Sequence, residues 1–355
     1  MLTVITLEGD MLEYISRRKR IRPCQIQKGV LPRNKSYNIQ VKIYVVITSF
    51  NEPITIGKAI EQIICPNREL WPSLQLVVVA PDESTLNKAE EVCQKCNFKN
   101  VTFIKDHEQG KPVALDLAVD TITRGTVGIQ QDDLLILTDG DVYLGDDAIK
   151  NLLNNFRHDG MTGGVGGHPV SVDSRGSMFG YFSHLFCEAA HVRRTASFAM
   201  MTVSMSGYLY AIRGDLLGQI FPIPAQIRAE DAYISQKTFS LGYKIAYAPN
   251  ALVYVKFPKN LSDWYKQKTR SLGGNVQLSD PSLHSSPLHP LSPRRSIIQD
   301  LQMAFFPLTF AKSPKELFWS LLLYPLRFLL WIRIYYNHAL KRYKSGAWER
   351  IDSSK

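Results

Sequence analysis

The chain has 355 residues, of which 45% are hydrophobic and 21% charged, as expected of a globular protein with one large α/β domain and an appendage, or with two modest domains. The formal net charge of +10 is uneven, because residues 1–42 carry +6, residues 263–355 carry +8 and the middle carries −4. This distribution argues against a nucleic-acid-binding groove and fits either a catalytic domain whose ends lie against anionic lipid headgroups or plain solubilising charge.

Residues 1–41 are predicted to form a basic N-terminal arm. Their cluster RRKRIR at 17–22 either binds a surface or is solvated, and no cleavable apolar segment follows it, so we expect no signal peptide. The five cysteines are an odd number for a secreted disulfide framework. The lone C-x-x-C at Cys93 and Cys96 lies in a helical pattern, so both are interpreted as helix residues of a protein in a reducing cytosol.

Residues 42–278 show the regular pattern of an α/β domain. Buried parallel strands are predicted at 43–48, 74–80, 101–104 and 134–138, with helices near 54–65, 84–96 and 111–123. Strands that alternate with crossover helices predict a doubly wound sheet, whose ligands bind outside the carboxyl ends of the strands. Segment 160–258 mixes short strands with helices, and its GGVGG at 163–167 predicts a flexible turn or a strand rather than a nucleotide loop.

Residues 279–296 predict a linker, and residues 297–355 predict membrane-associated helices and a basic tail. Leu317–Tyr336 has 20 residues, enough to span a bilayer. Pro325 and two arginines are costly in a lipid-exposed span, and the basic residues after it would lie on the wrong side of the membrane if the catalytic domain is cytosolic. An interfacial or re-entrant helix removes both objections; one or two true spans and an ordinary buried helix are the alternatives.

Asp139-Gly140-Asp141 follows the fourth predicted strand. Two carboxylates one residue apart at a strand end make a hard-oxygen site that suits Mg²⁺ or Mn²⁺, with part of the coordination left to phosphate oxygens. Gly140 permits a tight turn that aims both side chains at one point. Two solvated aspartates in a loop are the alternative, because the D-x-D pattern is common by chance.

Further polar residues follow strands of the same predicted sheet. Ser49, Asn51 and Glu52 follow the first strand, where Asn and Glu can accept hydrogen bonds from a nucleobase or ribose, or cap the next helix. Asp82 follows the second strand, where it could also contact the nucleoside. Lys111 opens a helix, where it can face a diphosphate together with free backbone N–H groups. The alternative for Lys111 is a surface lysine.

Two later segments contain residue types that suit group transfer. Asp231 opens a helix, where it can be the general base for an acceptor hydroxyl or an ordinary helix N-cap. Gln267 and Arg270 lie three residues apart on one face of another helix. Arg270 suits a diphosphate or the charge on a leaving group, and the alternative is an exposed helix charge.

The ordered set VVITSFNEP, VVVAPDEST, HEQGKPVALDLA, LILTDGDV, SMSGYLYAIR, AEDAYIS and QKTRS resembles the family 2 inverting glycosyltransferases of the nucleotide-diphospho-sugar (GT-A) fold, over about residues 42–277. The resemblance implies a mixed, doubly wound GT-A sheet and a Mn²⁺ or Mg²⁺ cofactor. It further implies a nucleotide-sugar donor, with a UDP-sugar expected, and a lipid-linked or glycan acceptor at the cytosolic face of a membrane. No nucleic-acid partner is expected.

The resemblance also implies residue roles. Glu52 and Asp82 would hold the base and ribose, and Asp139 would lie near the ribose and the metal. Asp141 would ligate the metal that bridges the donor diphosphate, and Asp231 would deprotonate the acceptor. Direct displacement of the nucleoside diphosphate then inverts the configuration at the anomeric carbon, so no second, nucleophilic carboxylate is required.

Gln267 and Arg270 match the first and fourth positions of the Q-x-x-R-W motif of processive members such as cellulose, chitin and hyaluronan synthases. Ser271 stands where that motif has a Trp that stacks on the acceptor sugar, and Trp264 is expected to face another direction. A processive polysaccharide synthase is therefore one alternative, although such enzymes need several spanning helices. A non-catalytic sugar-nucleotide-binding protein is another, and it would be expected to lose the carboxylates. A nucleotidyltransferase would need a Gly-rich loop after the first strand.

Overall fold

The structure is a computed structural model that describes residues 41–124, 129–157, 160–199, 204–280, 297–340 and 353. The N-terminal arm with its basic cluster, and residues 281–296 of the predicted linker, lie outside these ranges. Residues Ile39–Lys355 form one compact unit.

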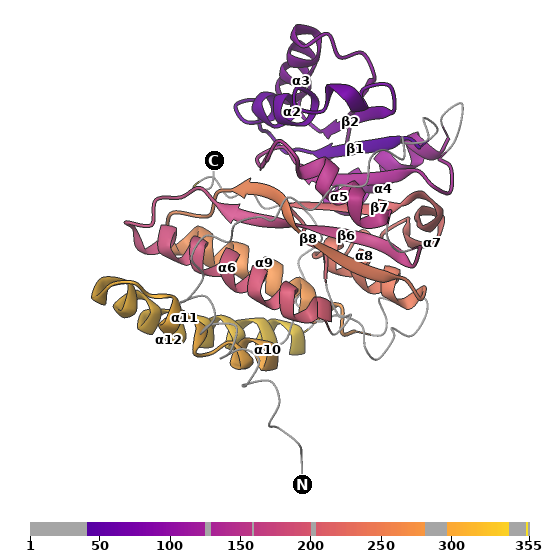
Figure 1. Ribbon diagram of the computed structural model, residues 1–355. Coiled ribbons are helices and arrows are strands. Elements are labelled where there is room, and N and C mark those ends of the chain that lie inside the picture. Colours follow the sequence, from indigo (N-terminus) through magenta and orange to yellow (C-terminus); the bar gives the residue numbers. More distant parts are fainter. Residues whose placement is uncertain are drawn as a thin grey trace, which may run out of the picture. The chain divides into compact units, whose positions relative to one another are not determined.

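The centre of this unit is a mixed sheet with the strand order β3-β2-β1-β4-β7-β6-β8-β5 (Figure 1). The strands are β1 (Ile43–Thr48), β2 (Leu74–Ala80), β3 (Val101–Lys105), β4 (Leu134–Asp139), β5 (Tyr143–Leu144), β6 (Thr162–Ser171), β7 (Leu209–Arg213) and β8 (Lys244–Val255). The pairs among β1–β4 are parallel, as is β6 with β8. β7 runs antiparallel to both β4 and β6, and β5 runs antiparallel to β8.

Helices cover both faces of the sheet. Those of the first part of the chain are α2 (Ile56–Ile64), η1 (Arg68–Leu70), α3 (Glu83–Lys95), α4 (Lys111–Thr123), α5 (Ala148–Phe156) and α6 (Met178–Ala199). Later ones are η2 (Gly214–Leu216), α7 (Leu217–Ile220), α8 (Glu230–Ser240), α9 (Leu261–Gln277), α10 (Ile297–Gln302), α11 (Phe306–Phe310) and α12 (Pro314–Ala339). One core cluster joins α2, α3 and α5 to the sheet, and a second joins α4, α7 and α8 to the opposite face.

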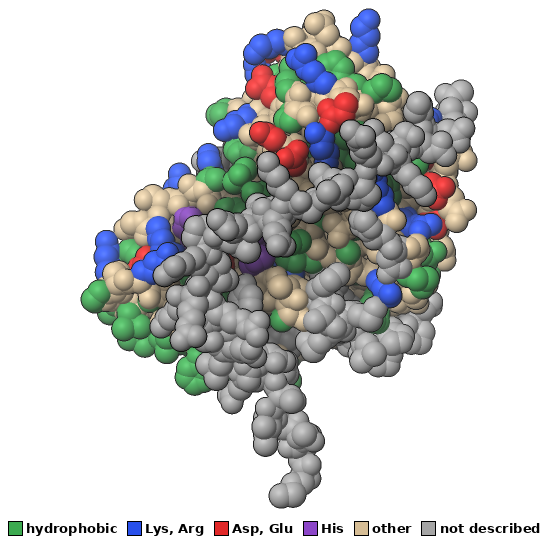
Figure 2. All heavy atoms as spheres, viewed as in Figure 1, with side chains coloured by type: hydrophobic (Ala, Val, Ile, Leu, Met, Phe, Trp, Pro, Cys, Tyr) green, Lys and Arg blue, Asp and Glu red, His purple; other side chains and the backbone are tan. Residues whose placement is uncertain are grey.

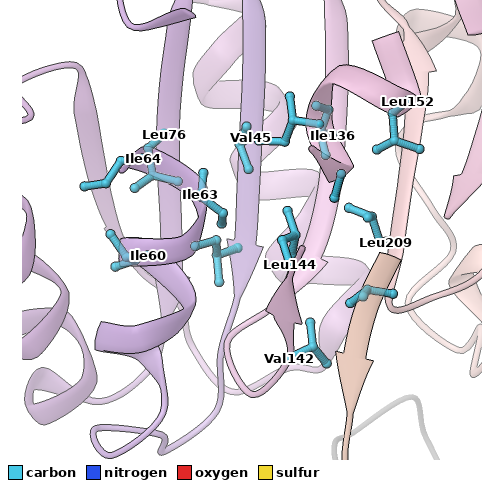
Figure 3. Packing of buried hydrophobic residues seen from close by; sticks show 14 of the residues in the cluster. Val45, Ile60, Ile63, Ile64, Leu76, Ile136, Val142, Leu144, Leu152 and Leu209 are labelled. Atoms are coloured by element: carbon cyan, nitrogen blue, oxygen red, sulfur yellow. The ribbon is translucent and has the colours of Figure 1, made fainter. Parts of the chain in front are cut away.

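The first half of the sheet follows the sequence pattern closely. β1 is buried at all six positions because its apolar residues meet helices on both faces. Val45, Leu76 and Ile136 of three neighbouring strands belong to the same core cluster as Ile60 of α2 (Figure 3). The predicted strands at 43–48 and 74–80 are confirmed, and those at 101–104 and 134–138 each extend by one residue.

The glycine-rich stretch at 163–167 is part of β6, so its strand interpretation is confirmed and the turn interpretation is wrong. The glycines are needed for close packing. A Cβ on Gly163 would lie 2.6 Å from Cβ of Tyr243, and one on Gly167 would lie 2.9 Å from Cδ2 of Leu209. Any larger residue at these positions would force β6 away from its neighbours.

The C-terminal helices pack on the outer side of α6 and α9. The third core cluster contains Tyr181 and Phe182 of α6, Trp264 of α9, and Leu330 and Trp331 of α12. α12 begins where the Ser313 side chain accepts a hydrogen bond from the Glu316 N–H (3.3 Å), with proline in the first turn. Among the described residues, α12 is the one helix long and apolar enough to cross a membrane.

Candidate active site

The carboxyl end of β4 meets the amino terminus of α4 in a buried ion-pair cluster. Nζ of Lys111 lies 2.5 Å from Oδ1 of Asp139 and 2.9 Å from Oε1 of Glu230, the first residue of α8. The Lys111 side chain is only 11% exposed, so the surface-lysine interpretation is wrong. The cluster joins the two halves of the sheet, because Lys111 belongs to the first and Glu230 to the second.

Lys111 and Glu230 hold each other ionised, whereas burial raises the pKa of Asp139 despite the neighbouring ammonium. Burial alone lowers the pKa of Lys111, but the negative charges of Asp139 and Glu230 raise it well above its usual value. Burial opposes ionisation of Glu230, yet the ammonium of Lys111 and its hydrogen bond lower the Glu230 pKa. The single cation therefore compensates two carboxylates.

The Asp-Gly-Asp turn lies directly against the loop after β1. The Gly140 N–H donates to the Thr48 carbonyl (3.0 Å), and a Cβ on Gly140 would lie 2.4 Å from Oγ of Ser49. Glycine is thus required at position 140 because the Ser49 side chain lies too close for a Cβ atom. Burial and the neighbouring charge of Asp139 raise the pKa of Asp141 to about 6. The negative charges of Asp139 and Asp141 repel each other at this turn. A cation bound between them would relieve this repulsion.

The residues expected to contact the donor nucleoside lie together in one loop region. Ser49 Oγ donates to Oε2 of Glu52 (2.9 Å), and the Asn51 N–H donates to Oδ2 of Asp82 (2.8 Å). Asp82 is the N-cap of α3, since its Oδ1 accepts from the Thr85 N–H (2.8 Å). Asp82 thus fixes the loop and caps α3. After the first strand the N-cap of α2 is Thr55, so the capping interpretation of Asn51 and Glu52 is wrong.

Asp231 is held by backbone donors at the start of α8. Its Oδ2 accepts from the Gly207 N–H (3.0 Å) and its Oδ1 from the Ala232 N–H (2.9 Å). The N-cap of α8 is Ala229, so the interpretation of Asp231 as a helix cap is wrong. Burial, followed by the charge of Glu230, raises the pKa of Asp231 to about 6.

The loop before β7 fixes the position of Asp231. Ser235 Oγ donates to the Asp231 carbonyl (2.6 Å) and accepts from the Met205 N–H (3.0 Å). Nε of the buried Arg194 in α6 donates to the carbonyl of Ser204 (3.2 Å). Arg194 was not found from the sequence, because its effect depends on a loop ten residues later in the chain and on α8.

Tyr210 and Glu230 are further site residues that the sequence patterns did not single out. The hydroxyl of Tyr210 is buried and has no hydrogen-bond partner within the described ranges. Burial and the charge of Glu230 raise its pKa well above the usual value. Strand alternation over 209–213 puts Tyr210 on the face opposite to Leu209, which is the only signal that the sequence offers for it.

α9 contributes Gln267 and Arg270. Burial raises the pKa of Asp139 and Asp141, and the positive charge of Arg270 opposes this rise and helps to lower the pKa of Glu230. This half-buried guanidinium therefore acts on the acidic cluster and is not an ordinary exposed helix charge. Oε1 of Gln267 is buried without a hydrogen-bond partner in the part of the chain that the structure describes. Trp264 is 1% exposed and packs near Phe186, so it points into the core as expected.

Comparison with known proteins identifies the family. A sequence model described as "Glycosyltransferase like family 2" matches residues 40–274. The chain belongs to this family. It is a glycosyltransferase with a GT-A fold, and the non-catalytic and nucleotidyltransferase alternatives are set aside.

Relatives of this glycosyltransferase include the poly-beta-1,6-N-acetyl-D-glucosamine synthases of Staphylococcus aureus (strain COL) and Staphylococcus epidermidis. They are 23% and 24% identical, and each match covers 69% of this chain. The match spans only 58% and 57% of the relatives' own length. Among solved structures, a mannosyltransferase, PcManGT of Pyrobaculum calidifontis in complex with GDP-Man and Mn²⁺, matches with a TM-score of 0.54 and 17% identity, covering 95% of this chain and 89% of that one. This likeness shows the fold.

Proposed function

We propose that the protein is a divalent-metal-dependent, inverting glycosyltransferase that moves a sugar from a nucleotide-diphospho-sugar, with UDP-sugars preferred, to a hydroxyl of a lipid-linked or membrane-proximal glycan. The reaction would take place at the cytosolic face of a membrane. The observation that carries the proposal is a positioned carboxylate, Asp231, next to the Asp-Gly-Asp turn and its ion-pair cluster.

Asp231 is proposed to take the proton of the acceptor hydroxyl. Its two oxygens each accept a backbone N–H, which fixes the direction of the carboxylate without neutralising it. A pKa of about 6 leaves Asp231 ionised near neutral pH and still basic enough to accept a proton. Arg270 and Lys111 would attract the negative charge that develops on the leaving nucleoside diphosphate.

The residues present fit a nucleotide-bound metal rather than a fully protein-bound one. Within the described ranges no group of three or more His, Cys, Asp or Glu side chains could hold a metal ion. The carboxylates of Asp139 and Asp141 supply the hard-oxygen ligands at this turn. Mg²⁺ and Mn²⁺ fill such sites with phosphate and water oxygens. When bound, the metal would neutralise charge on the donor diphosphate.

The loop after β1 is proposed to hold the nucleoside. Glu52 and Asp82 lie within one hydrogen-bonded loop region beside the turn that carries Asp141, so a base and ribose bound there would place the diphosphate next to the metal site. PcManGT, whose fold is similar, was solved with GDP-Man, so a GDP-sugar is the alternative donor. The test therefore uses both classes of donor.

A processive polysaccharide synthase is the second candidate, and the names of the staphylococcal relatives favour it. Against it stands Ser271, at the position where processive members have a stacking Trp. The match covers less than two thirds of the length of those relatives. We therefore do not infer that this enzyme makes the same polymer as they do. Product length separates the candidates: one sugar added per acceptor rejects a processive enzyme.

The test is nucleoside-diphosphate release from UDP- and GDP-sugars, with Mn²⁺ or Mg²⁺, in detergent or vesicles. Asp231→Asn is expected to lower kcat by about 10²–10⁴-fold, the range for a lost general base, without weakening donor binding. Asp141→Asn should lose turnover together with metal-dependent donor binding. Asp146→Asn is the matched control, because Asp146 is exposed and close to the same turn. Full activity in Asp231→Asn would reject the assigned base, and no donor binding in the wild type would reject the donor class.

A further inference from the structure

α12 is buried along one side only. Leu323, Leu330 and Ile334 are at most 3% exposed and belong to the core cluster shared with α6 and α9. These positions recur at helical spacing, so they form a single inward stripe. Many side chains on the other side of this 26-residue helix are exposed.

Two ion pairs fasten the C-terminal helices to each other and to the catalytic domain. Arg175, in the loop before α6, donates from Nε to Oε1 of Glu316 (2.6 Å) and from Nη2 to Oε2 (3.0 Å). Asp300 of α10 accepts hydrogen bonds from Arg327 and from the Trp331 indole. Of the two arginines that count against a spanning helix in the sequence, Arg327 is therefore paired inside the protein.

The outward side of these helices is strongly apolar. Hydrophobic side chains gather over α11 and α12 at the lower left of Figure 2. The large exposed ones on α12 are Leu317, Phe318, Leu321, Leu322, Phe328, Leu329, Ile332, Tyr335 and Tyr336, and those in or next to α10 are Ile298, Leu301 and Phe305. Phe318 and Phe328 are each 64% exposed and Phe305 is 75% exposed. Such a continuous patch marks an interaction surface.

The charges on this outward side have one sign. Asp300 and Glu316 are the only acidic residues in 297–340, and both are engaged with arginines inside. Lys312 and Arg333 are exposed, whereas Nζ of Lys315 donates to the Gly176 carbonyl in the loop before α6 (3.3 Å). An apolar face that carries cations and lacks an unpaired carboxylate is complementary to a bilayer with anionic headgroups.

We propose that α10–α12 lie in the plane of an anionic bilayer surface, with the outward side of α12 in the headgroup and acyl boundary, and that α12 does not cross the membrane. A crossing would separate α12 from α6 and α9 and would leave Arg175 and Asp300 without their partners. This proposal adds to the proposed function a surface that would hold the enzyme at the membrane. It rests on the proposed function only for the identity of the acceptor.

The first experiment is flotation of the full chain, without donor, with vesicles of phosphatidylcholine alone or with 30 mol% phosphatidylglycerol (about one anionic lipid in three, in the range that polybasic surfaces respond to). We expect stronger binding to the anionic vesicles. Phe328→Glu should weaken binding by about 10-fold or more, the equivalent of losing one buried aromatic side chain. Met161→Glu is the matched control, because Met161 is 50% exposed and lies outside the C-terminal helices.

The second experiment distinguishes a helix lying on the bilayer from one crossing it. In a background with Cys24, Cys65 and Cys96 changed to Ser, Lys312→Cys and Leu340→Cys place a thiol near each end of α12. A membrane-impermeant maleimide added outside sealed vesicles should label both positions. Protection of one end until detergent is added would mean a spanning helix and would overturn the proposal.

Two other results would also overturn it. Equal vesicle binding by the wild type, Phe328→Glu and Met161→Glu would show that another surface binds lipid. Absence of vesicle binding, together with a dimer that Phe328→Glu dissociates, would show that a second copy of the chain covers α12. Nucleotide-sugar turnover in detergent is measured separately, so failure of the membrane inference is distinguishable from failure of the proposed reaction.

Discussion

The two halves of the sheet differ in how they contribute to the site. β1–β4 are parallel and carry the Asp-Gly-Asp turn and Lys111 at their carboxyl ends, in the arrangement that open α/β sheets use for ligands. β5–β8 are mixed and bring Glu230 and Asp231 from a helix that follows an antiparallel strand. The site is complete only where β4 meets β7.

This junction shows that the chemistry depends on contacts between the halves. The Lys111–Glu230 ion pair crosses it, and Thr138 Oγ1 of β4 donates to the Tyr208 carbonyl (2.9 Å) just before β7. Glu230 of the second half takes its ion-pair partner, Lys111, from the first half. Variants that act on the junction, on the first half and on the second half should therefore behave differently.

The largest effect is expected at the junction. Lys111→Met leaves Asp139 and Glu230 buried without their cation, and we expect the free energy of unfolding to fall by about 3–5 kcal/mol. Urea denaturation at neutral pH measures it. Lys88→Met, which removes an exposed pair with Glu91, is the control and should change stability by less than about 1 kcal/mol. Equal losses in the two variants would mean that the junction is not held by this cation.

The first half is tested at its tight turn. Gly140→Ala would press a methyl group against Ser49, and overpacking of this kind costs about 1–3 kcal/mol. The thermal midpoint should fall, and metal-dependent donor binding should weaken because the turn carries Asp141. Gly218→Ala, in α7, has no atom within 4 Å of the new methyl group and should be neutral or slightly stabilising. If Gly140→Ala is destabilised but binds the donor as the wild type does, the turn does not form the metal site.

The second half is tested through the titration of Asp231. Its pKa is raised to about 6 and the base must be ionised, so at saturating metal kcat should fall about tenfold per pH unit below pH 6. Glu230→Gln removes a negative charge that raises this pKa, so the acidic limb should move to lower pH. Asp146→Asn should leave the limb in place. A limb that stays fixed in Glu230→Gln would show that another group controls the profile.

The sequence predicted the first half well because its signal is local. Runs such as 43–48 and 74–80 are mostly apolar because both faces are covered, and the predicted site residues of this half lie at or after the carboxyl ends of the strands. The second half depends on contacts between distant residues. The glycines of β6 are required by Tyr243 and Leu209, and the role of Glu230 is set by Lys111, far away in the chain.

The same distinction applies at the C-terminus. Leu317–Tyr336 has the length and hydropathy of a membrane span, and α12 extends from Pro314 to Ala339. The packing of α6 and α9 decides which side of α12 is covered. The residues of α6 and α9 are distant in the sequence, so the local pattern around α12 does not contain this information. The second apolar stretch, 297–311, forms only α10 and α11, which are too short to span a bilayer.

α9 has one consequence for the acceptor. The same helix packs against α12 through Trp264 and contributes Arg270 to the acidic cluster. Packed helices lie about 8–10 Å apart, so with α12 in the bilayer surface the reacting sugar would sit only about one to two helix diameters above the lipids. At that height the acceptor hydroxyl must be near the membrane end of its molecule, which favours a lipid carrying one or a few sugars over the tip of a long chain.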